Sequence, residues 1–383
     1  MDITMPNTLL KQAIKEEARK VGFHIVGVTT PDPPSHYAVY KTWLAHNYHA
    51  GMAWMATNRA LARRANLRLI LPECQSVLVL GMAYPPPASN PTDIQGTGRV
   101  ASYAWGEDYH DLIPKALQAI VQFIETHVGA PVPNRWYTDT GPILERELAQ
   151  RAGLGWIGKN TCLINPQLGS YFLLAEILLG IELAPDPPFS ADRCGTCTRC
   201  LDHCPTACIL PNRMIDANRC ISYLTIEHKE AIPVELRERL GSWIFGCDIC
   251  QQVCPWNQTS SFPRWHPGFS PRPGVRHPNL ADELFLTPQA FNRKFKGNPV
   301  KRAKRRGYLR NVAVALGNQR NSSAIPALKL AINDPEPLVR EHAAWALGKI
   351  GGKNSLQVLL AARANENTPT VLQEIQSALR EMN

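Results

Sequence analysis

The spacing of the cysteines constrains this chain more than any other feature. Residues 194–209 read CGTCTRCLDHCPTACI, with the spacing C-x2-C-x2-C-x3-C followed by proline. This run is typical of bacterial ferredoxins with two 4Fe–4S clusters, where three thiolates hold one cluster and the fourth holds the other. The run therefore predicts a second cysteine group elsewhere in the chain.

The second group lies in GCDICQQVCPWN, which repeats C-x2-C-x3-C-P, and its simplest first partner is Cys220. Between Cys220 and Cys247 lie 26 residues, which suggests a helical insertion. The crossed arrangement predicts that the first cluster is held by Cys194, Cys197, Cys200 and Cys254. The second is then held by Cys204, Cys220, Cys247 and Cys250.

A pair of zinc sites is the alternative, because C-x2-C pairs also bind zinc. Eight ligands in two C-x3-C-P groups favour iron and sulfur instead. Three cysteines remain, and we expect each to be a small buried apolar residue: Cys74, Cys162 and Cys208.

Composition places the chain among globular proteins of two or three domains. It has 383 residues, of which 44% are hydrophobic and 19% charged, with a net charge of +9. No run of about 18 apolar residues predicts a spanning helix. The first 20 residues lack the apolar core of an export signal and predict an amphipathic helix. We therefore expect a cytoplasmic protein, in which clustered thiols bind metal.

Residues 1–185 alternate between helical and strand-like patterns and predict an α+β domain with α/β-like character. Apolar runs at 23–30 and 76–85 predict buried strands, and 112–129 predicts a helix that ends at a glycine. Residues 169–180 predict a strand followed by a turn. Neither a dinucleotide-binding nor a P-loop motif is present.

Three further segments complete the predicted organisation. Residues 186–260 form a double-cluster, ferredoxin-like domain, and 261–306 form a connector with a basic segment. Residues 307–383 repeat the triplet ALG at 315–317 and 346–348, a period of 31 that indicates HEAT-like helical repeats. A plain helical cap is the alternative.

The densest polar stretch before the clusters is WYTDTGPILERELAQRAGLGWIGKNTCLI, residues 136–164. Asp139 or Thr140 could be a helix N-cap, with Pro142 in the first turn. A carboxyl group in this position could also face a cavity. The glycines of 153–158 could let the backbone approach a large planar ligand.

Together, ASYAWGEDYHD (101–111), DTGPILERELAQRAGLGWIGKN (139–160), the split cysteine motif and the repeat tail resemble the epoxyqueuosine reductase family. The resemblance covers nearly the whole chain. Members use cobalamin and two 4Fe–4S clusters, are related to reductive dehalogenases, and reduce epoxyqueuosine in the tRNA wobble position to queuosine, the last step of queuosine biosynthesis.

The resemblance implies roles for individual residues. Asp139 matches the proton-donating aspartate of the family and lies at the cofactor. Further cobalamin contacts are implied at Arg64, Ala101, Leu163, Leu174, Ser222, Cys247 and Asp248. The implied chemistry takes up two electrons and two protons. The clusters deliver electrons singly, and a placed carboxylic acid protonates the leaving oxygen.

The resemblance also gives the basic segment a role. Residues 291–310 hold nine Lys and Arg residues, which could be a solvated linker or could clamp an anticodon stem. We expect phosphate contacts from Lys301, Arg302, Lys304, Arg305 and Arg306. The other expected partner is an unidentified electron donor of flavodoxin or ferredoxin type, and we expect a monomer.

Two alternative functions belong to other classes. One is a corrinoid reductase of a small molecule, similar to reductive dehalogenases. The other is a ferredoxin-like electron carrier without catalytic activity, for which an N-terminal domain of roughly 185 residues would be superfluous.

Overall fold

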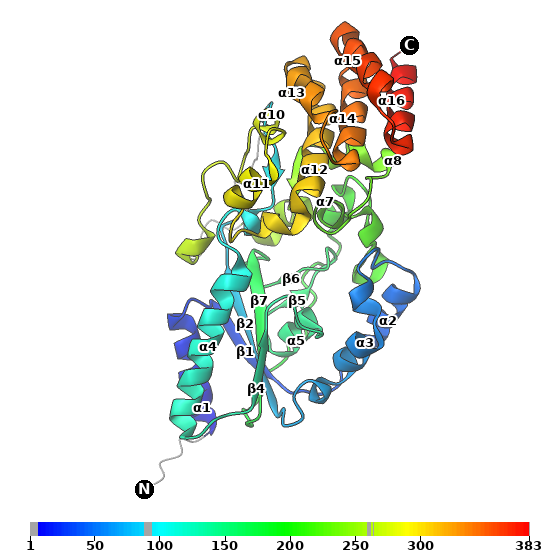
Figure 1. The fold of residues 1–383 in the computed structure, drawn as a ribbon. Helices are drawn as coiled ribbons and strands as arrows, with labels where there is room; N and C mark the ends of the chain where they lie inside the picture. Colours follow the sequence, from blue (N-terminus) through cyan, green and yellow to red (C-terminus); the bar gives the residue numbers. More distant parts are fainter. Residues whose placement is uncertain (1–6, 88–93, 259–261, 263, 383) are drawn as a thin grey trace. The chain divides into compact units, whose positions relative to one another are not determined.

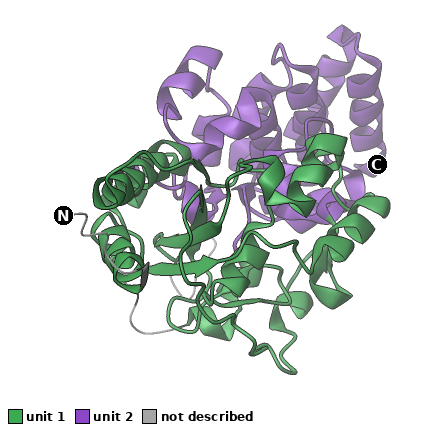
Figure 2. Ribbon diagram, turned by 90° about the horizontal axis from the view of Figure 1, so that it is seen from below, with its two compact units in different colours: residues 1–87, 107–216, 249–270 green, residues 88–106, 217–248, 271–383 purple. Residues whose placement is uncertain are grey.

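The computed structural model describes residues 7–87, 94–258, 262 and 264–382, so residues 1–6 of the predicted N-terminal segment lie outside it. The chain forms two compact units (Figure 2). Unit 1 comprises residues 1–87, 107–216 and 249–270, and unit 2 comprises 88–106, 217–248 and 271–383. The units thus interleave along the sequence, whereas the predicted domains were consecutive segments.

Unit 1 is built on a four-stranded sheet in the order β1-β2-β7-β4 (Figure 1). The strands are β1 (Ile25–Thr29), β2 (Ser76–Ala83), β7 (Phe172–Leu179) and β4 (Asn134–Tyr137). All three pairings are antiparallel, which confirms the α+β prediction. The predicted strands at 23–30, 76–85 and 169–180 are confirmed as well.

Two helices, α1 (Asn7–Lys20) and α4 (Tyr109–Val128), pack against each other beside this sheet (Figure 1). The apolar stripe of α1 is buried at Leu10, Ile14 and Ala18, as its periodicity predicts. Helix α4 ends at Gly129, whose φ of 78° lies in the left-handed region that glycine tolerates.

Helix α5 (Glu145–Arg151) contacts β1, β2 and β7 and shares a buried apolar cluster with them. The hairpin of β5 (Trp156–Ile157) and β6 (Leu163–Ile164) follows α5. Helices α2 (Tyr37–Ala45) and α3 (Asn58–Ala65) come between β1 and β2 in the chain. Short elements close the unit: α6 (Arg199–Asp202), β8 (Ile209–Leu210), β9 (Met214–Ile215) and α9 (Ile249–Gln252).

Unit 2 begins with a parallel pair, β3 (Arg99–Val100) and β10 (Trp243–Phe245), with α7 (Ile221–Ile226) and α8 (Val234–Arg237) nearby in the chain. The HEAT-like prediction is confirmed by α12 (Lys304–Gln319), α13 (Ile325–Ala331), α14 (Pro337–Ile350), α15 (Gly352–Asn365) and α16 (Pro369–Glu381). Helix α12 packs on α14, and α14 packs on α16. The glycines of the two ALG triplets lie at these contacts.

The described part of the predicted connector is folded. It contains α10 (Leu280–Glu283), α11 (Pro288–Lys294) and a 3-10 helix at Pro299–Ala303. Phe291 and Phe295 lie 5.7 and 5.1 Å, between ring centroids, from Tyr308 of α12. This aromatic cluster anchors the segment to the repeats. Among the helices of the described chain, none combines the length and apolar character needed to cross a bilayer.

Candidate active site

A cavity of about 610 Å³ lies within unit 1, and both Arg64 and Asp139 line it. The resemblance had placed these two residues at one site, and the fold brings them to one cavity. Helix α2 contributes an apolar wall that includes Tyr40 and Trp43. The segment between β4 and α5 and the first turn of α5 also line the cavity.

The loop that carries Asp139 connects β4 to α5. Helix α5 begins at Glu145 with Leu144 as its N-cap, so the prediction of a cap at Asp139 or Thr140 is wrong. Asp139 instead has φ of 59°, a left-handed conformation that aspartate tolerates better than most residues. Thr138 fastens the loop, because its Oγ1 donates to the Leu174 carbonyl of β7 at 2.9 Å.

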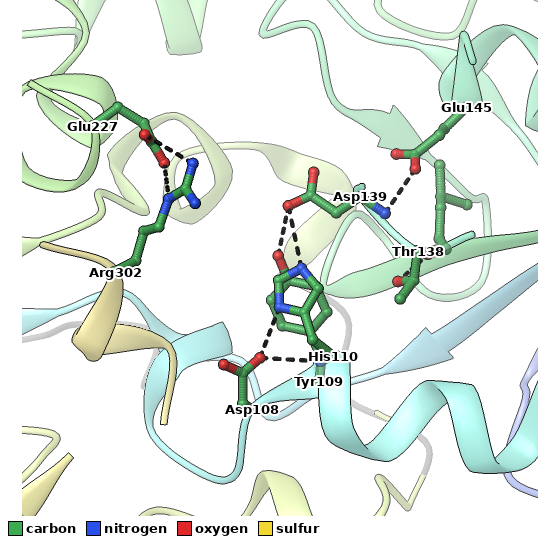
Figure 3. Close-up of polar contacts among 9 residues, drawn as sticks. Asp108, Tyr109, His110, Thr138, Asp139, Glu145, Glu227 and Arg302 are labelled. Atoms are coloured by element: carbon green, nitrogen blue, oxygen red, sulfur yellow. Dashed lines mark hydrogen bonds and ion pairs between the residues drawn. The ribbon is translucent and has the colours of Figure 1, made fainter. Parts of the chain in front are cut away.

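Two hydrogen bonds hold Asp139 (Figure 3). The Tyr109 hydroxyl donates to its Oδ2 at 2.6 Å, and its backbone N–H donates to Glu145 Oε1 at 2.8 Å. The Asp139 side chain remains 66% exposed. The carboxyl group is thus positioned on one side and open to a bound molecule on the other.

The first turn of α4 supplies both Tyr109 and His110. Asp108 caps this helix, and its Oδ1 lies 2.8 Å from His110 Nδ1. The Asp108 hydrogen bond raises the pKa of His110, although partial burial opposes it. Nε2 of His110 lies 4.0 Å from Asp139 Oδ2.

Sequence reasoning missed two carboxyl groups behind Asp139. Burial, assisted by the charge of Asp139, raises the pKa of Glu145 to about 8. Burial also raises the pKa of Glu176 well above its ordinary value, and the charges of Glu145 and Asp139 act in the same direction. The available signal was a single acidic residue inside the apolar strand FLLAEILL.

Arg64 brings a cation to the cavity. Its side chain is 8% exposed, its guanidinium lies 5.3 Å from the Tyr40 ring centroid, and Nη1 donates to the Ala60 carbonyl at 3.5 Å. Among the described residues no carboxylate forms an ion pair with it. A buried guanidinium in this state suits the carbonyl or phosphate oxygens of a large polar ligand.

The first predicted cluster set lies entirely in unit 1. Burial raises the pKa of the Cys254 thiol to about 11, and the neighbouring Cys194, Cys200 and Cys162 act in the same direction. Cys194 and Cys254 also pack in one apolar cluster with Trp156. Three of the four predicted ligands of the first cluster, Cys194, Cys200 and Cys254, therefore lie near one another. Among the described residues no three His, Cys, Asp or Glu side chains lie close enough to hold a single metal ion.

The segment GLGWIGKN supports this cysteine loop. Trp156 Nε1 donates to Cys194 Sγ at 3.4 Å, and Lys159 Nζ donates to the carbonyls of Gly195 and Cys197 at 2.8 and 3.0 Å. The glycines serve internal packing: a Cβ at Gly155 would lie 2.1 Å from the Ile164 carbonyl oxygen. Internal packing explains the presence of glycine at these positions without the close approach of a planar ligand.

The second predicted set is divided between the units. Cys204 and Cys250 belong to unit 1, whereas Cys220 and Cys247 belong to unit 2. Cys208 is buried, as expected, and its Sγ lies 3.4 Å from that of Cys204. Cys74 is also buried, but Cys162 is only half-buried and lies beside the first cysteine set, contrary to the expectation for it.

Within unit 2, two further predicted positions lie close together. The Ala101 backbone N–H donates to the Phe245 carbonyl at 2.8 Å, and Asp248 Oδ2 accepts from the Ser102 backbone N–H at 2.8 Å. A Cβ at Gly246 would lie 2.5 Å from the Cβ of Ala101. Ser222 belongs to α7, which contacts β10 just before Gly246.

Leu163 and Leu174 are placed differently from these residues. Leu163 is 4% exposed and Leu174 packs against the same apolar cluster, which lies between the sheet and α5. The Leu163 side chain belongs to the core of unit 1, whereas that of Leu174 is half-buried at its edge.

The basic residues predicted to bind RNA divide into two kinds. Lys301, Lys304 and Arg306 are exposed. Arg302 is exposed but pairs with both oxygens of Glu227, at 2.7 and 3.1 Å (Figure 3). Arg305 is 14% exposed and makes two hydrogen bonds to Asp334. The structure thus gives Arg305 an internal partner.

Comparison with known proteins is consistent along the whole chain. Family models match residues 64–140 (epoxyqueuosine reductase QueG), 193–257 (4Fe-4S double cluster binding domain) and 304–380 (HEAT repeats). An epoxyqueuosine reductase of Pseudomonas aeruginosa is 41% identical over 348 residues, 89% of this chain and 95% of that protein. That of Escherichia coli is 38% identical over 343 residues, 89% of each chain.

Solved structures agree. A crystal structure of an epoxyqueuosine reductase with an epoxyqueuosine-modified tRNA-Tyr stem loop is similar at a TM-score of 0.90 and 31% identity, and covers 98% of this chain and 99% of that one. A Bacillus subtilis epoxyqueuosine reductase, with its aspartate catalytic loop described as swung out of the active site, matches at a TM-score of 0.89, 31% identity and the same coverage.

Proposed function

This chain belongs to the epoxyqueuosine reductase family, and on that premise we propose that it reduces epoxyqueuosine in tRNA to queuosine with Asp139 as the acid. The observation that supports this role is the Asp139 carboxyl group, which lines a cavity and is held by Tyr109. Conversion of the epoxide to the alkene takes up two electrons and two protons and releases water. The family, and not the cavity alone, identifies the substrate.

We propose that cobalamin and two 4Fe–4S clusters are the cofactors. The double-cluster domain is present, and the first cysteine set is gathered in unit 1. The buried guanidinium of Arg64 fits an amide-rich corrinoid. The contacts that the family resemblance implies at Ala101, Ser222, Cys247 and Asp248 stay proposals. Cobalamin would supply a cobalt centre that accepts electrons one at a time from the clusters and reduces the substrate.

Residues of the chain would hold the proton and transfer it to the substrate. Tyr109 donates to Oδ2 of Asp139, which leaves Oδ1 to carry the transferable proton toward the cavity. Asp139 gives this proton to the epoxide oxygen as the first C–O bond breaks, so that an alkoxide does not have to leave. The hydrogen bond from Asp139 N–H to Glu145 keeps the loop in place meanwhile.

For tRNA, we propose that Lys301, Lys304 and Arg306 contact phosphates, with Arg302 able to join them by exchanging Glu227 for a phosphate. Arg305 is not among the proposed phosphate contacts, because it forms an ion pair with Asp334. The two relatives of 38 and 41% identity are epoxyqueuosine reductases, which favours neither a small-molecule dehalogenase nor an electron carrier.

The test is single-turnover conversion of epoxyqueuosine in tRNA, followed by nucleoside mass spectrometry with chemically supplied electrons. Asp139→Asn keeps the shape of the side chain but cannot release a proton. We expect it to retain both clusters and cobalamin binding, with a rate lowered roughly 10²–10⁴-fold, the usual contribution of a placed acid. Near-normal turnover would remove Asp139 from this role and direct attention to Tyr109 and His110.

A further inference from the structure

The Trp156 indole contacts a predicted ligand of the first cluster, and the proposed mechanism does not use it. Trp156 is the first residue of β5 and is 2% exposed. Its Nε1–H donates to Cys194 Sγ at 3.4 Å. The rings of Phe189 and Trp256 pack against the indole at centroid distances of 5.6 and 5.0 Å. The indole N–H is therefore held toward a sulfur atom by a buried aromatic group.

Lys159 reaches the same cysteine loop from the segment between β5 and β6. Its Nζ donates to the carbonyls of Gly195 and Cys197 at 2.8 and 3.0 Å. The loop is a tight turn at this point, because the Cys197 N–H donates to the Cys194 carbonyl at 3.0 Å. Lys159 thus brings a positive charge to the backbone between the first two predicted ligands.

The surroundings of these thiols suit a 4Fe–4S cluster. Such a cluster binds one thiolate at each iron, so its ligands lie farther apart than the ligands of a single metal ion. Cys194 and Cys254 pack in one apolar cluster with Trp156, and Cys200 is near enough to influence the Cys254 thiol. Apolar surroundings lower the local dielectric constant, which strengthens a hydrogen bond to a charged sulfur.

Reduction of a 4Fe–4S cluster adds one electron and neither forms nor breaks a bond. The added negative charge is shared with the sulfur atoms. An N–H donor or a cation beside a ligand sulfur therefore stabilises the reduced form more than the oxidised form. Hydrogen bonds to the sulfurs are one of the factors that set the reduction potential of these clusters.

We propose that Trp156 and Lys159 raise the reduction potential of the first cluster, so that a low-potential one-electron donor reduces it more readily. Trp156 acts through its hydrogen bond to Cys194, and Lys159 through its charge at the loop. Both are positioning residues, since they act through the cysteine ligands. This inference rests on the proposed cofactors.

Trp156→Phe removes the N–H donor and keeps an aromatic ring. The measurement is a redox titration of the reconstituted protein, followed by electron paramagnetic resonance. We expect the ratio of reduced to oxidised first cluster at a fixed potential to fall roughly tenfold, which is a potential about 59 mV lower for a one-electron couple. The second cluster should keep its wild-type potential. The signal of the first cluster is the one that Cys254→Ala removes.

Trp256→Phe is the matched control. Trp256 packs in the same apolar cluster, but its Nε1 donates to the Arg193 carbonyl at 3.2 Å and not to a sulfur atom. This variant should keep the wild-type potential of the first cluster. An equal fall in both tryptophan variants would show that aromatic packing sets the potential, and would overturn the role of the Trp156 N–H.

Lys159→Gln tests the charge separately, because glutamine can still donate to the loop carbonyls. We expect the ratio of reduced to oxidised first cluster to fall roughly threefold, a smaller effect since the ammonium group bonds to carbonyls and not to sulfur. Lys159→Arg keeps the charge and should keep the wild-type potential. A wild-type potential in Lys159→Gln would overturn the role of Lys159.

A measurement on the wild-type chain needs no substitution at Trp156 and decides the question if Trp156→Phe fails to assemble the cluster. With nitrogen-15 in the indole rings, pulsed electron paramagnetic resonance of the reduced protein should detect an isotropic coupling to an indole nitrogen, because a hydrogen bond passes spin density from sulfur to its donor. The coupling should persist in Trp256→Phe. Its absence, or an unchanged potential in Trp156→Phe, would overturn the proposal. A reconstituted wild-type protein without any 4Fe–4S signal would refute the proposed cofactors instead.

Discussion

The raised pKa of Glu145 makes the free energy of unfolding depend on pH. This dependence can be measured without substrate. The pKa of Glu145 in the folded chain is raised to about 8 from an ordinary 4.5, mainly by burial. The folded chain therefore binds a proton that the unfolded chain releases between these pH values. The contribution of Glu145 to the free energy of unfolding is complete below about pH 4.5 and is lost as the pH rises through about 8.

We therefore expect Glu145→Gln to gain stability relative to the wild type as the pH rises from 5 to 8. Urea unfolding at a series of pH values measures the difference. Glu147→Gln is the comparison, because Glu147 pairs with His36 and its pKa is lowered. The relative stability of that variant should fall as the pH rises through the lowered pKa of Glu147, and should recover as the pH rises through the pKa of His36, which Glu147 raises. Parallel pH dependences for the two variants would contradict this assignment of charge states.

At the scale of elements, two glycines of α12 have different environments. A Cβ at Gly317 would lie 2.5 Å from Trp345 and 2.9 Å from the Ala346 Cα of α14. A Cβ at Gly307 would meet only the Ala303 Cβ, at 4.0 Å. The first glycine permits the close approach of two helices, whereas the second does not.

We expect Gly317→Ala to lower the free energy of unfolding by about 1–3 kcal/mol, the usual cost of overpacking. Gly307→Ala should raise it by roughly 0.5–1 kcal/mol, because alanine is the better helix former. Thermal or urea unfolding of the two variants provides the measurement. Equal effects of the two substitutions would mean that helix propensity, and not interhelical packing, controls both sites.

Substitutions in the basic segment should have two different effects, one on tRNA binding and one on the stability of the fold. Replacing Lys301, Lys304 and Arg306 with Gln should weaken tRNA binding and reduce the salt slope by roughly two, because three fewer counterions are released. Arg305→Gln should instead destabilise the fold by roughly 3 kcal/mol, since it removes the ion-pair partner of the buried Asp334 carboxylate. Filter binding across salt concentrations tests the first statement and urea unfolding the second. Unchanged affinity in the triple variant would identify the segment as a solvated surface.

At the scale of the whole molecule, the cysteines should make a two-cluster electron path. We expect about eight iron atoms per chain after anaerobic reconstitution, in two 4Fe–4S clusters. Cys254→Ala should remove the first cluster and Cys204→Ala the second, as followed by iron analysis and electron paramagnetic resonance. Loss of the first cluster's signal in Cys204→Ala would contradict the crossed ligand scheme.

Local patterns in the sequence were enough to predict much of this protein. Cysteine spacing predicted the double-cluster domain, and residue periodicity predicted β1, β2, α4 and the helical repeats, because both properties depend on residues close together in the chain. The motif around Asp139 led to the family. The interleaving of the two units was not visible, since it depends on which distant segments pack together.

The surroundings of Asp139 depend on packing between segments that are distant in the sequence. Its partner Tyr109 is 30 residues away, and only the fold brings the start of α4 to the loop after β4. The same periodicity that suggested a cap at Asp139 is satisfied by a helix that starts at Glu145. In the sequence, Glu176 is a single polar residue within an apolar strand. Its burial depends on tertiary packing over the sheet. Burial and charge at these positions are set by tertiary neighbours, because the pKa of a carboxyl group depends on what surrounds it in space.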